Sequence, residues 1–128
     1  MLKEALFCLA LNIYYEANVE PIEGKYAVAQ VTLNRVAHKN YPDKICEVVY
    51  EPYQFSWTLE KQKPPSGPGW KEAQRVAKVV LNGWSPDFTK GATHYHNDTV
   101  NPHWAPKLKK IKRIGKHTFY KLPPKKQA

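Results

Sequence analysis

The sequence predicts a single α+β domain that is mainly helical, with helices in its first two thirds and a small sheet late in the chain. Apolar residues recur at helical spacing as far as Gly83, and short segments rich in His, Thr, Tyr and Phe follow. The chain has 128 residues, of which 42% are hydrophobic. That suits one hydrophobic core, so we expect one domain that folds alone.

The first helix is predicted over residues 2–17. Leu2, Leu6, Leu9 and Ile13 recur at steps of four, three and four, so they lie along one face. This apolar start resembles the core of a signal peptide, but no small-residue cleavage site follows it. We therefore expect no signal peptide in this chain, and either phage-type release or an export segment that has already been removed.

The next two helices follow breaks in the chain. The second is expected after Pro21 and ends near His38, because apolar residues recur between them at helical spacing. Asp43 is expected to be the N-cap of a short third helix that runs through Ile45 and Val49 and is closed by Pro52, since an aspartate side chain can accept a hydrogen bond from the first turn.

A fourth helix and a small sheet complete the predicted fold. The Pro- and Gly-rich residues 61–69 are typical of a surface loop, and the apolar spacing after them predicts a helix that ends before Gly83. Strands are predicted over residues 91–96 and 116–121. A turn at Gly115 would join the second strand to residues 111–114 as a hairpin.

The charge balance restricts the class of partner. The formal net charge is +9, from 20 Lys and Arg against 11 acidic residues, so nucleic acid, anionic lipid and bacterial wall polymers all fit. We expect no nucleic-acid binding, because the Lys residues cluster toward the C-terminus instead of alternating with aromatics. No segment has the roughly 20 apolar residues that span a membrane, so no membrane insertion is expected.

Glu16 is the candidate catalytic residue. It falls at the C-terminal end of the first predicted helix and follows Tyr14 and Tyr15. Partial burial among aromatic side chains would raise the pKa of its carboxyl group, which suits a general acid near neutral pH. A solvated or salt-bridged glutamate at a helix end is the alternative.

Two further groups suit the binding of sugars. In the segment Gln54-Phe-Ser-Trp57, aromatic rings can stack on sugar faces while Gln54 and Ser56 supply hydrogen bonds. His94 and His96 would share one face of a strand and could orient a substrate or pack. The alternative for the aromatics is a place in the core.

We expect neither a metal nor another cofactor. His94 and His96 would need a third ligand from His103, His117 or Cys46, and no recognised ligand spacing supplies one. Cys8 and Cys46 are expected to be two buried thiols, because two cysteines do not by themselves define a disulfide. Residues 115–120 are expected to close the sheet and to play no part in the chemistry.

Taken together, the motifs resemble the SleB-type cell wall hydrolase family, the catalytic domain of spore cortex-lytic enzymes and of related phage and bacterial wall hydrolases. The resemblance covers roughly residues 5–121 in order. It runs through Ala10-Leu-Asn-Ile-Tyr-Tyr-Glu-Ala17, Glu20-Pro-Ile-Glu-Gly24, Ala27-Val-Ala-Gln-Val-Thr-Leu-Asn-Arg-Val36, Tyr41-Pro42, Ile45-Cys-Glu-Val-Val49, Gln54-Phe-Ser-Trp57, Gly91-Ala-Thr-His-Tyr-His96, Pro102, Trp104 and residues 115–120.

The resemblance implies a goose-lysozyme-like or lytic-transglycosylase-like fold with a groove for a glycan strand. It implies a catalytic domain over residues 1–121, followed by a basic tail over residues 122–128, and a monomer that acts at the bacterial cell wall. Glu16 matches the acid of the family's Tyr-Glu-Ala motif. The expected substrate-binding residues are Gln54, Ser56, Trp57, His94, Tyr95 and His96.

The implied activity is cleavage of peptidoglycan between N-acetylmuramic acid and N-acetylglucosamine, as a lytic transglycosylase that leaves anhydromuramic ends. Muramidase-type hydrolysis would usually need a second acid, for which Glu20, Asp87 and Asp98 are the candidates. A non-catalytic wall-binding or virion module is a further alternative. It is favoured by one departure, since Asn18-Val19 stands where the family usually has Arg-Gly.

Overall fold

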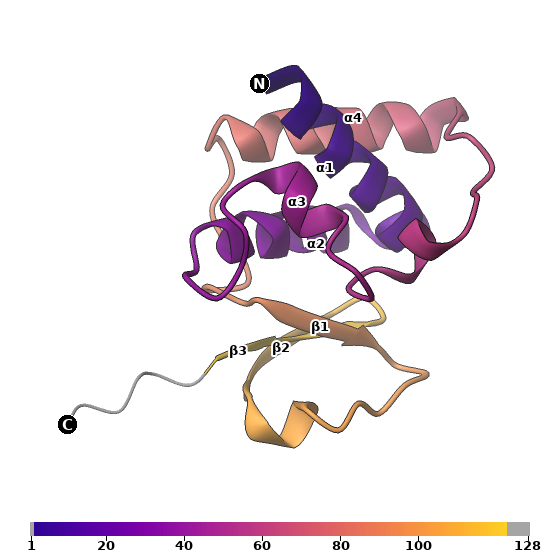
Figure 1. The fold of residues 1–128 in the computed structure, drawn as a ribbon. Coiled ribbons are helices and arrows are strands. Elements are labelled where there is room, and N and C mark those ends of the chain that lie inside the picture. Colours follow the sequence, from indigo (N-terminus) through magenta and orange to yellow (C-terminus); the bar gives the residue numbers. More distant parts are fainter. Residues whose placement is uncertain (1, 123–128) are drawn as a thin grey trace.

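The computed structural model describes residues 2–122, and the predicted basic tail lies outside the described residues except for Leu122. The helices are α1 (Leu2–Ala17), α2 (Ile22–Val36), α3 (Ile45–Val49) and α4 (Gly67–Leu81). They form one layer, and a small sheet lies beneath it (Figure 1). The predicted α+β architecture, with its helices first and its sheet late, is therefore confirmed.

The sheet has three antiparallel strands, β1 (His94–Asn97), β2 (Lys109–Ile114) and β3 (His117–Lys121), in the order β1-β3-β2. The predicted hairpin is present, because Gly115 turns β2 into β3 with a φ of 59°, which few residues other than glycine adopt. The first strand begins at His94, three residues later than predicted. Gly91 and Ala92 instead donate backbone hydrogen bonds to the side chains of Asp87 and Thr89 in a preceding turn.

Local details of the helices differ from the predictions by a few residues. Lys44, and not Asp43, is the N-cap of α3, and no side chain caps that helix. Asp43 lies one position too early for its carboxylate to accept a hydrogen bond from the first turn of α3. The helix α4 begins at Gly67, inside the segment predicted as a loop.

Two groups of buried residues form the core. The first packs α1 against α4, with Leu9, Ile13 and Val76 among its members. The second includes Val28 of α2 and Phe119 of β3, and it joins the helical layer to the sheet. Because α1 contributes to both groups, its C-terminal end is fixed where the two layers meet.

Cys8 and Cys46 form a disulfide, with their Cα atoms 5.3 Å apart. The expectation of two separate thiols was wrong. The sequence could not show that α3 packs beside α1, and this packing brings together two residues that are 38 positions apart. A bridge of this separation restricts the unfolded chain, by about 4 kcal/mol in the chain-entropy account.

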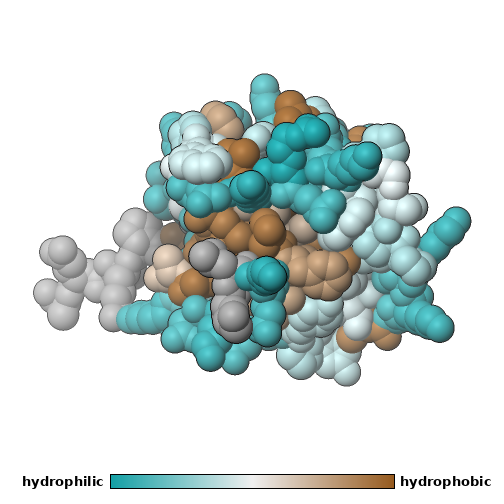
Figure 2. Space-filling model, turned by 90° about the horizontal axis from the view of Figure 1, so that it is seen from above, coloured by the Kyte–Doolittle hydropathy of each residue, from teal (hydrophilic) through white to brown (hydrophobic). Residues whose placement is uncertain are grey.

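The face that carries α1 and α4 has a hydrophobic centre between hydrophilic margins (Figure 2). Leu6, Phe7, Ala10 and Trp70 line a shallow depression between these two helices. Within residues 2–122, no helix combines the length and the apolar character needed to cross a bilayer.

Candidate active site

A groove of about 520 Å³ lies where the end of α1 meets the sheet and the segment that contains η1 (Ser56–Leu59). Its lining residues are Tyr15, Glu16, Tyr53, Gln54, Ser56, Leu59, Tyr95, His96, Asn97, Val100, Pro102, Trp104 and His117. A larger hollow of about 670 Å³ lies beside Cys46 and Ile45, but none of the predicted site residues lines it. We therefore take the first groove as the candidate site.

Glu16 lies at the C-terminal end of α1 and is half-buried. Burial raises the pKa of its carboxyl group above the usual value for glutamate. A hydrogen bond from the Tyr95 hydroxyl to Glu16 Oε1, 2.5 Å long, and the positive charge of Arg35 act in the opposite direction without cancelling this rise. The carboxyl group therefore holds its proton to a higher pH than an exposed glutamate does.

Tyr95 is held so that its hydroxyl points at Glu16. Its ring centroid lies 4.9 Å from that of His117, 5.5 Å from that of Phe119 and 6.5 Å from that of Phe55. Burial, followed by the nearby Glu16 charge, raises the pKa of the Tyr95 hydroxyl well above its usual value. Tyr95 consequently remains a hydrogen-bond donor throughout the neutral range.

Arg35 is a member of the site that the sequence prediction missed. It is buried on α2, where Nε donates to the Thr93 carbonyl at 2.8 Å and Nη1 donates to Gln54 Oε1 at 3.2 Å. Its guanidinium also lies 5.3 Å from the centroid of the Phe55 ring. Two sequence signals could have singled it out, its charge on the apolar face of a predicted helix and its place in the family motif over residues 27–36.

Four of the six predicted substrate-binding residues line the groove with Glu16: Gln54, Ser56, Tyr95 and His96. Trp57 lies outside the lining, where its indole Nε1 donates to Asn12 Oδ1 at 2.8 Å and its ring lies 4.8 Å from that of Tyr15. In that position it supports the wall of the groove.

His94 also lies outside the lining. Its ring lies 5.1 Å from that of Trp104, and burial lowers its pKa to about 4, so it is neutral near pH 7. His96 contacts the same tryptophan at 5.8 Å, so the two histidines do share one side of the strand. Within residues 2–122, no group of three or more His, Cys, Asp or Glu residues is arranged to hold a metal.

Glu16 is the only acidic residue among the groove-lining residues that the structure describes. The candidate second acids have other contacts. Glu20 is buried and accepts a hydrogen bond from the backbone N–H of Lys116, Asp87 accepts from Thr89 and Gly91, and Asp98 pairs with Arg113.

The two residues that depart from the family pattern lie outside the groove lining. Val19 is 88% exposed, and it is not among the non-glycine residues of the described chain that have a positive φ, which are Tyr53 and Lys90. The backbone at Val19 therefore does not require a glycine. Asn18 lies against Gly69 at the start of α4, where a side chain on residue 69 would overlap it.

Comparison with known proteins places this architecture and groove in a family. A family model described as Cell Wall Hydrolase matches residues 19–120, which include every groove-lining residue except Tyr15 and Glu16. The chain belongs to the cell wall hydrolase family. The resemblance inferred from the sequence motifs is thereby confirmed.

Two spore cortex-lytic enzymes and two solved structures are similar to most of this chain. The spore cortex-lytic enzyme of Halalkalibacterium halodurans is 39% identical over 114 residues, which are 87% of this chain and 33% of that protein. The spore cortex-lytic enzyme of Bacillus subtilis is 36% identical over 87% of this chain and 35% of its own length. The chain thus spans about a third of the length of these two relatives.

Two solved structures match this chain over nearly their whole length. The catalytic domain of the germination-specific lytic transglycosylase SleB from Bacillus anthracis aligns with a TM-score of 0.78 and 33% identity, over 91% of this chain and 93% of that domain. The catalytic domain of the Bacillus cereus SleB protein aligns with a TM-score of 0.74 and 33% identity, over 92% and 91%. The predicted lysozyme-like, lytic-transglycosylase-like fold is confirmed.

Proposed function

We propose that this chain cleaves peptidoglycan between N-acetylmuramic acid and N-acetylglucosamine as a lytic transglycosylase, with Glu16 as its catalytic acid and base. The observation that carries the proposal is the presence of one carboxyl group, that of Glu16, among the described residues that line the groove. The names of the relatives, spore cortex-lytic enzyme and lytic transglycosylase, point to the same activity.

In the first step, protonated Glu16 donates its proton to the glycosidic oxygen. The bond between that oxygen and C1 of the muramic acid breaks, and an oxocarbenium-like transition state forms at C1. The raised pKa of Glu16 leaves more of this carboxyl group protonated at a given pH than in an exposed glutamate. The Tyr95 hydroxyl and the Arg35 charge then stabilise the carboxylate that remains.

In the second step, the Glu16 carboxylate removes the proton from the C6 hydroxyl of the same muramic acid. The C6 oxygen forms a bond to C1, which gives an anhydromuramic end and returns Glu16 to its protonated form. This course needs one protein carboxylate and consumes no water, whereas hydrolysis would usually need a second carboxylate beside the scissile bond.

The other groove residues fit a sugar strand. Tyr53 and Trp104 present aromatic surfaces on which the apolar faces of sugars stack, while Gln54 and Ser56 offer hydrogen bonds to hydroxyl and N-acetyl groups. All these residues come from one chain, and we propose that it acts at the bacterial cell wall as a monomer, without membrane insertion or nucleic-acid binding.

The origin of the oxygen in the products tests this reaction. Purified peptidoglycan would be digested in water enriched in ¹⁸O, and the soluble products would be analysed by mass spectrometry. The transglycosylase reaction predicts anhydromuramic products without the label. Labelled reducing ends would show muramidase-type hydrolysis, and binding without release of products would show a non-catalytic wall-binding module.

A further inference from the structure

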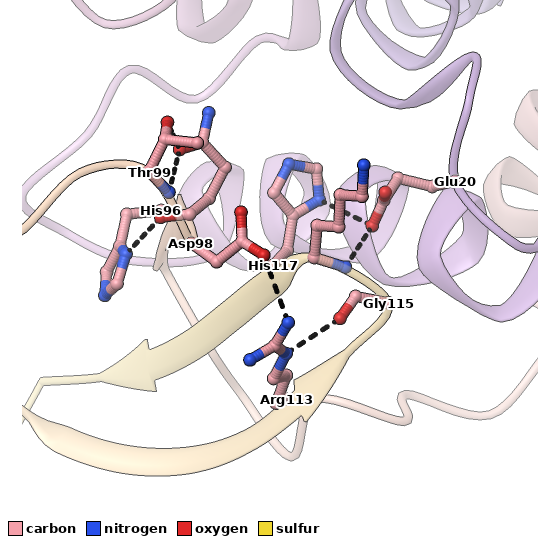
Figure 3. Close-up of polar contacts among 9 residues, drawn as sticks. Glu20, His96, Asp98, Thr99, Arg113, Gly115 and His117 are labelled. Carbon is pink, nitrogen blue, oxygen red and sulfur yellow. Dashed lines mark hydrogen bonds and ion pairs between the residues drawn. The ribbon is translucent and has the colours of Figure 1, made fainter.

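His117 lines the same groove as Glu16, although the sequence favoured a role for its segment in closing the sheet. It begins β3, and 7% of its surface is exposed. One ring nitrogen, Nδ1, is shielded from solvent and faces Glu20 Oε1 at 3.4 Å. Figure 3 shows the second ring nitrogen pointing away from Glu20.

The turn before His117 is fixed on the same carboxylate. Glu20 Oε1 accepts a hydrogen bond of 2.9 Å from the backbone N–H of Lys116. Gly115 approaches Glu20 so closely that a Cβ atom on residue 115 would lie 2.5 Å from Oε1. One buried carboxylate therefore accepts a hydrogen bond from the hairpin turn and lies beside the ring that follows it, whose Nδ1 has no hydrogen-bond partner within the described residues.

The surroundings of His117 favour a neutral ring. Burial lowers its pKa, and the nearby charge of His96 acts in the same direction, while Glu20 and Asp98 act against them. In the neutral ring, a proton on Nδ1 would face the Glu20 carboxylate, and Nε2 would then be a hydrogen-bond acceptor.

We infer that His117 is a sugar-binding residue whose Nε2 accepts a hydrogen bond from a hydroxyl group of the glycan in the groove, with Glu20 as the residue that positions its ring. The inference rests on the proposed function, because it assumes that the groove holds a glycan strand. His117 also touches Tyr95, with ring centroids 4.9 Å apart, so a sugar bound by His117 would lie beside the residue that contacts Glu16.

A purely structural histidine, which only packs on Tyr95 and faces Glu20, is the competing explanation. Two substitutions separate them, because asparagine places its amide near the position of Nδ1 whereas glutamine reaches toward that of Nε2. A sugar-binding role predicts that His117→Gln retains more affinity than His117→Asn. If His117 only faces Glu20, His117→Asn should instead retain more affinity than His117→Gln.

The experiment measures binding of a soluble disaccharide-peptide oligomer of peptidoglycan by calorimetry, in the Glu16→Gln background so that the ligand is not cleaved. We expect His117→Asn to weaken binding about tenfold and His117→Gln by less than about threefold. Glu20→Gln keeps an acceptor for the Lys116 N–H and should weaken binding by about threefold. His103→Gln, which removes an exposed histidine outside the groove lining, is the matched control and should change nothing.

Thermal unfolding of each variant would verify that it is folded. Equal affinity of His117→Asn and the parent, or better binding by His117→Asn than by His117→Gln, would overturn the inference while leaving the proposed function intact. Failure of the folded Glu16→Gln parent to bind any oligomer would count against the proposed function itself, and with it the role of His117.

Discussion

The Tyr95 hydroxyl on β1 donates a 2.5 Å hydrogen bond to the Glu16 carboxyl group at the end of α1. This contact joins the sheet to the helical layer inside the groove. It also stabilises the charged form of Glu16, against the burial that disfavours it. The pKa of Glu16 therefore reflects a balance between burial, which raises it, and the Tyr95 hydrogen bond, which lowers it.

Substituting Tyr95→Phe should shift this balance. Loss of the hydrogen bond to the carboxylate raises the pKa of Glu16 further, so the alkaline limb of the pH–rate profile should move to higher pH. The maximal rate should fall about tenfold or more, because the carboxyl group is less firmly oriented. Rates measured on labelled cell walls across pH test this. Tyr26→Phe, outside the groove lining, is the control, and an alkaline limb that moves to lower pH would contradict the account.

Substituting Glu16→Gln should stabilise the fold at neutral pH. The pKa of Glu16 is raised in the folded state, so its contribution to stability is fully present below the unfolded pKa and is lost as pH rises through the folded value. Glutamine cannot ionise and avoids that loss. The midpoint of thermal unfolding should therefore be higher for the variant at pH 7, and the difference should shrink below about pH 4. A difference that grows on acidification would be inconsistent with a raised pKa.

Substituting Arg35→Leu should destabilise the protein by about 2–3 kcal/mol. It leaves the Thr93 carbonyl without this donor and removes the link to Gln54. Urea denaturation measures the change in the free energy of unfolding. Arg113→Leu removes an exposed pair with Asp98 and should cost less than about 1 kcal/mol. Equal losses for the two variants would argue against a special role of Arg35.

Reducing the bridge between Cys8 and Cys46 should lower the free energy of unfolding by about 2–4 kcal/mol. Denaturation with and without a thiol reductant measures this, and a double variant with serine at both positions is the control. The double variant should be as unstable as the reduced protein and insensitive to the reductant. No effect of the reductant on the parent would contradict the prediction.

The sequence predicted elements whose signal is local. The repeat of Leu6, Leu9 and Ile13 predicted α1, because helical spacing along one face appears directly in the sequence. Gly115 predicted the hairpin for a similar reason, since a tight turn favours glycine. The capping role expected of Asp43 failed because a displacement of one residue is enough to remove a cap.

The features that were missed depend on contacts between distant residues. Arg35 contacts Thr93, and Cys8 meets Cys46 only because α1 and α3 pack side by side. The spacing of residues within one segment does not indicate which distant segment it contacts. The place of Trp57 beside Asn12 likewise depends on how its segment folds back on α1, and its role in substrate binding stays a prediction.

The most direct test of the central claim is the release of soluble fragments from labelled peptidoglycan by the wild type, by Glu16→Gln and by Glu47→Gln, which alters an exposed glutamate outside the groove lining. We expect Glu16→Gln to be folded and to lose at least about a thousandfold in rate, while Glu47→Gln matches the wild type. Release by folded Glu16→Gln at a rate near that of the wild type would contradict the assignment of Glu16 as the catalytic acid.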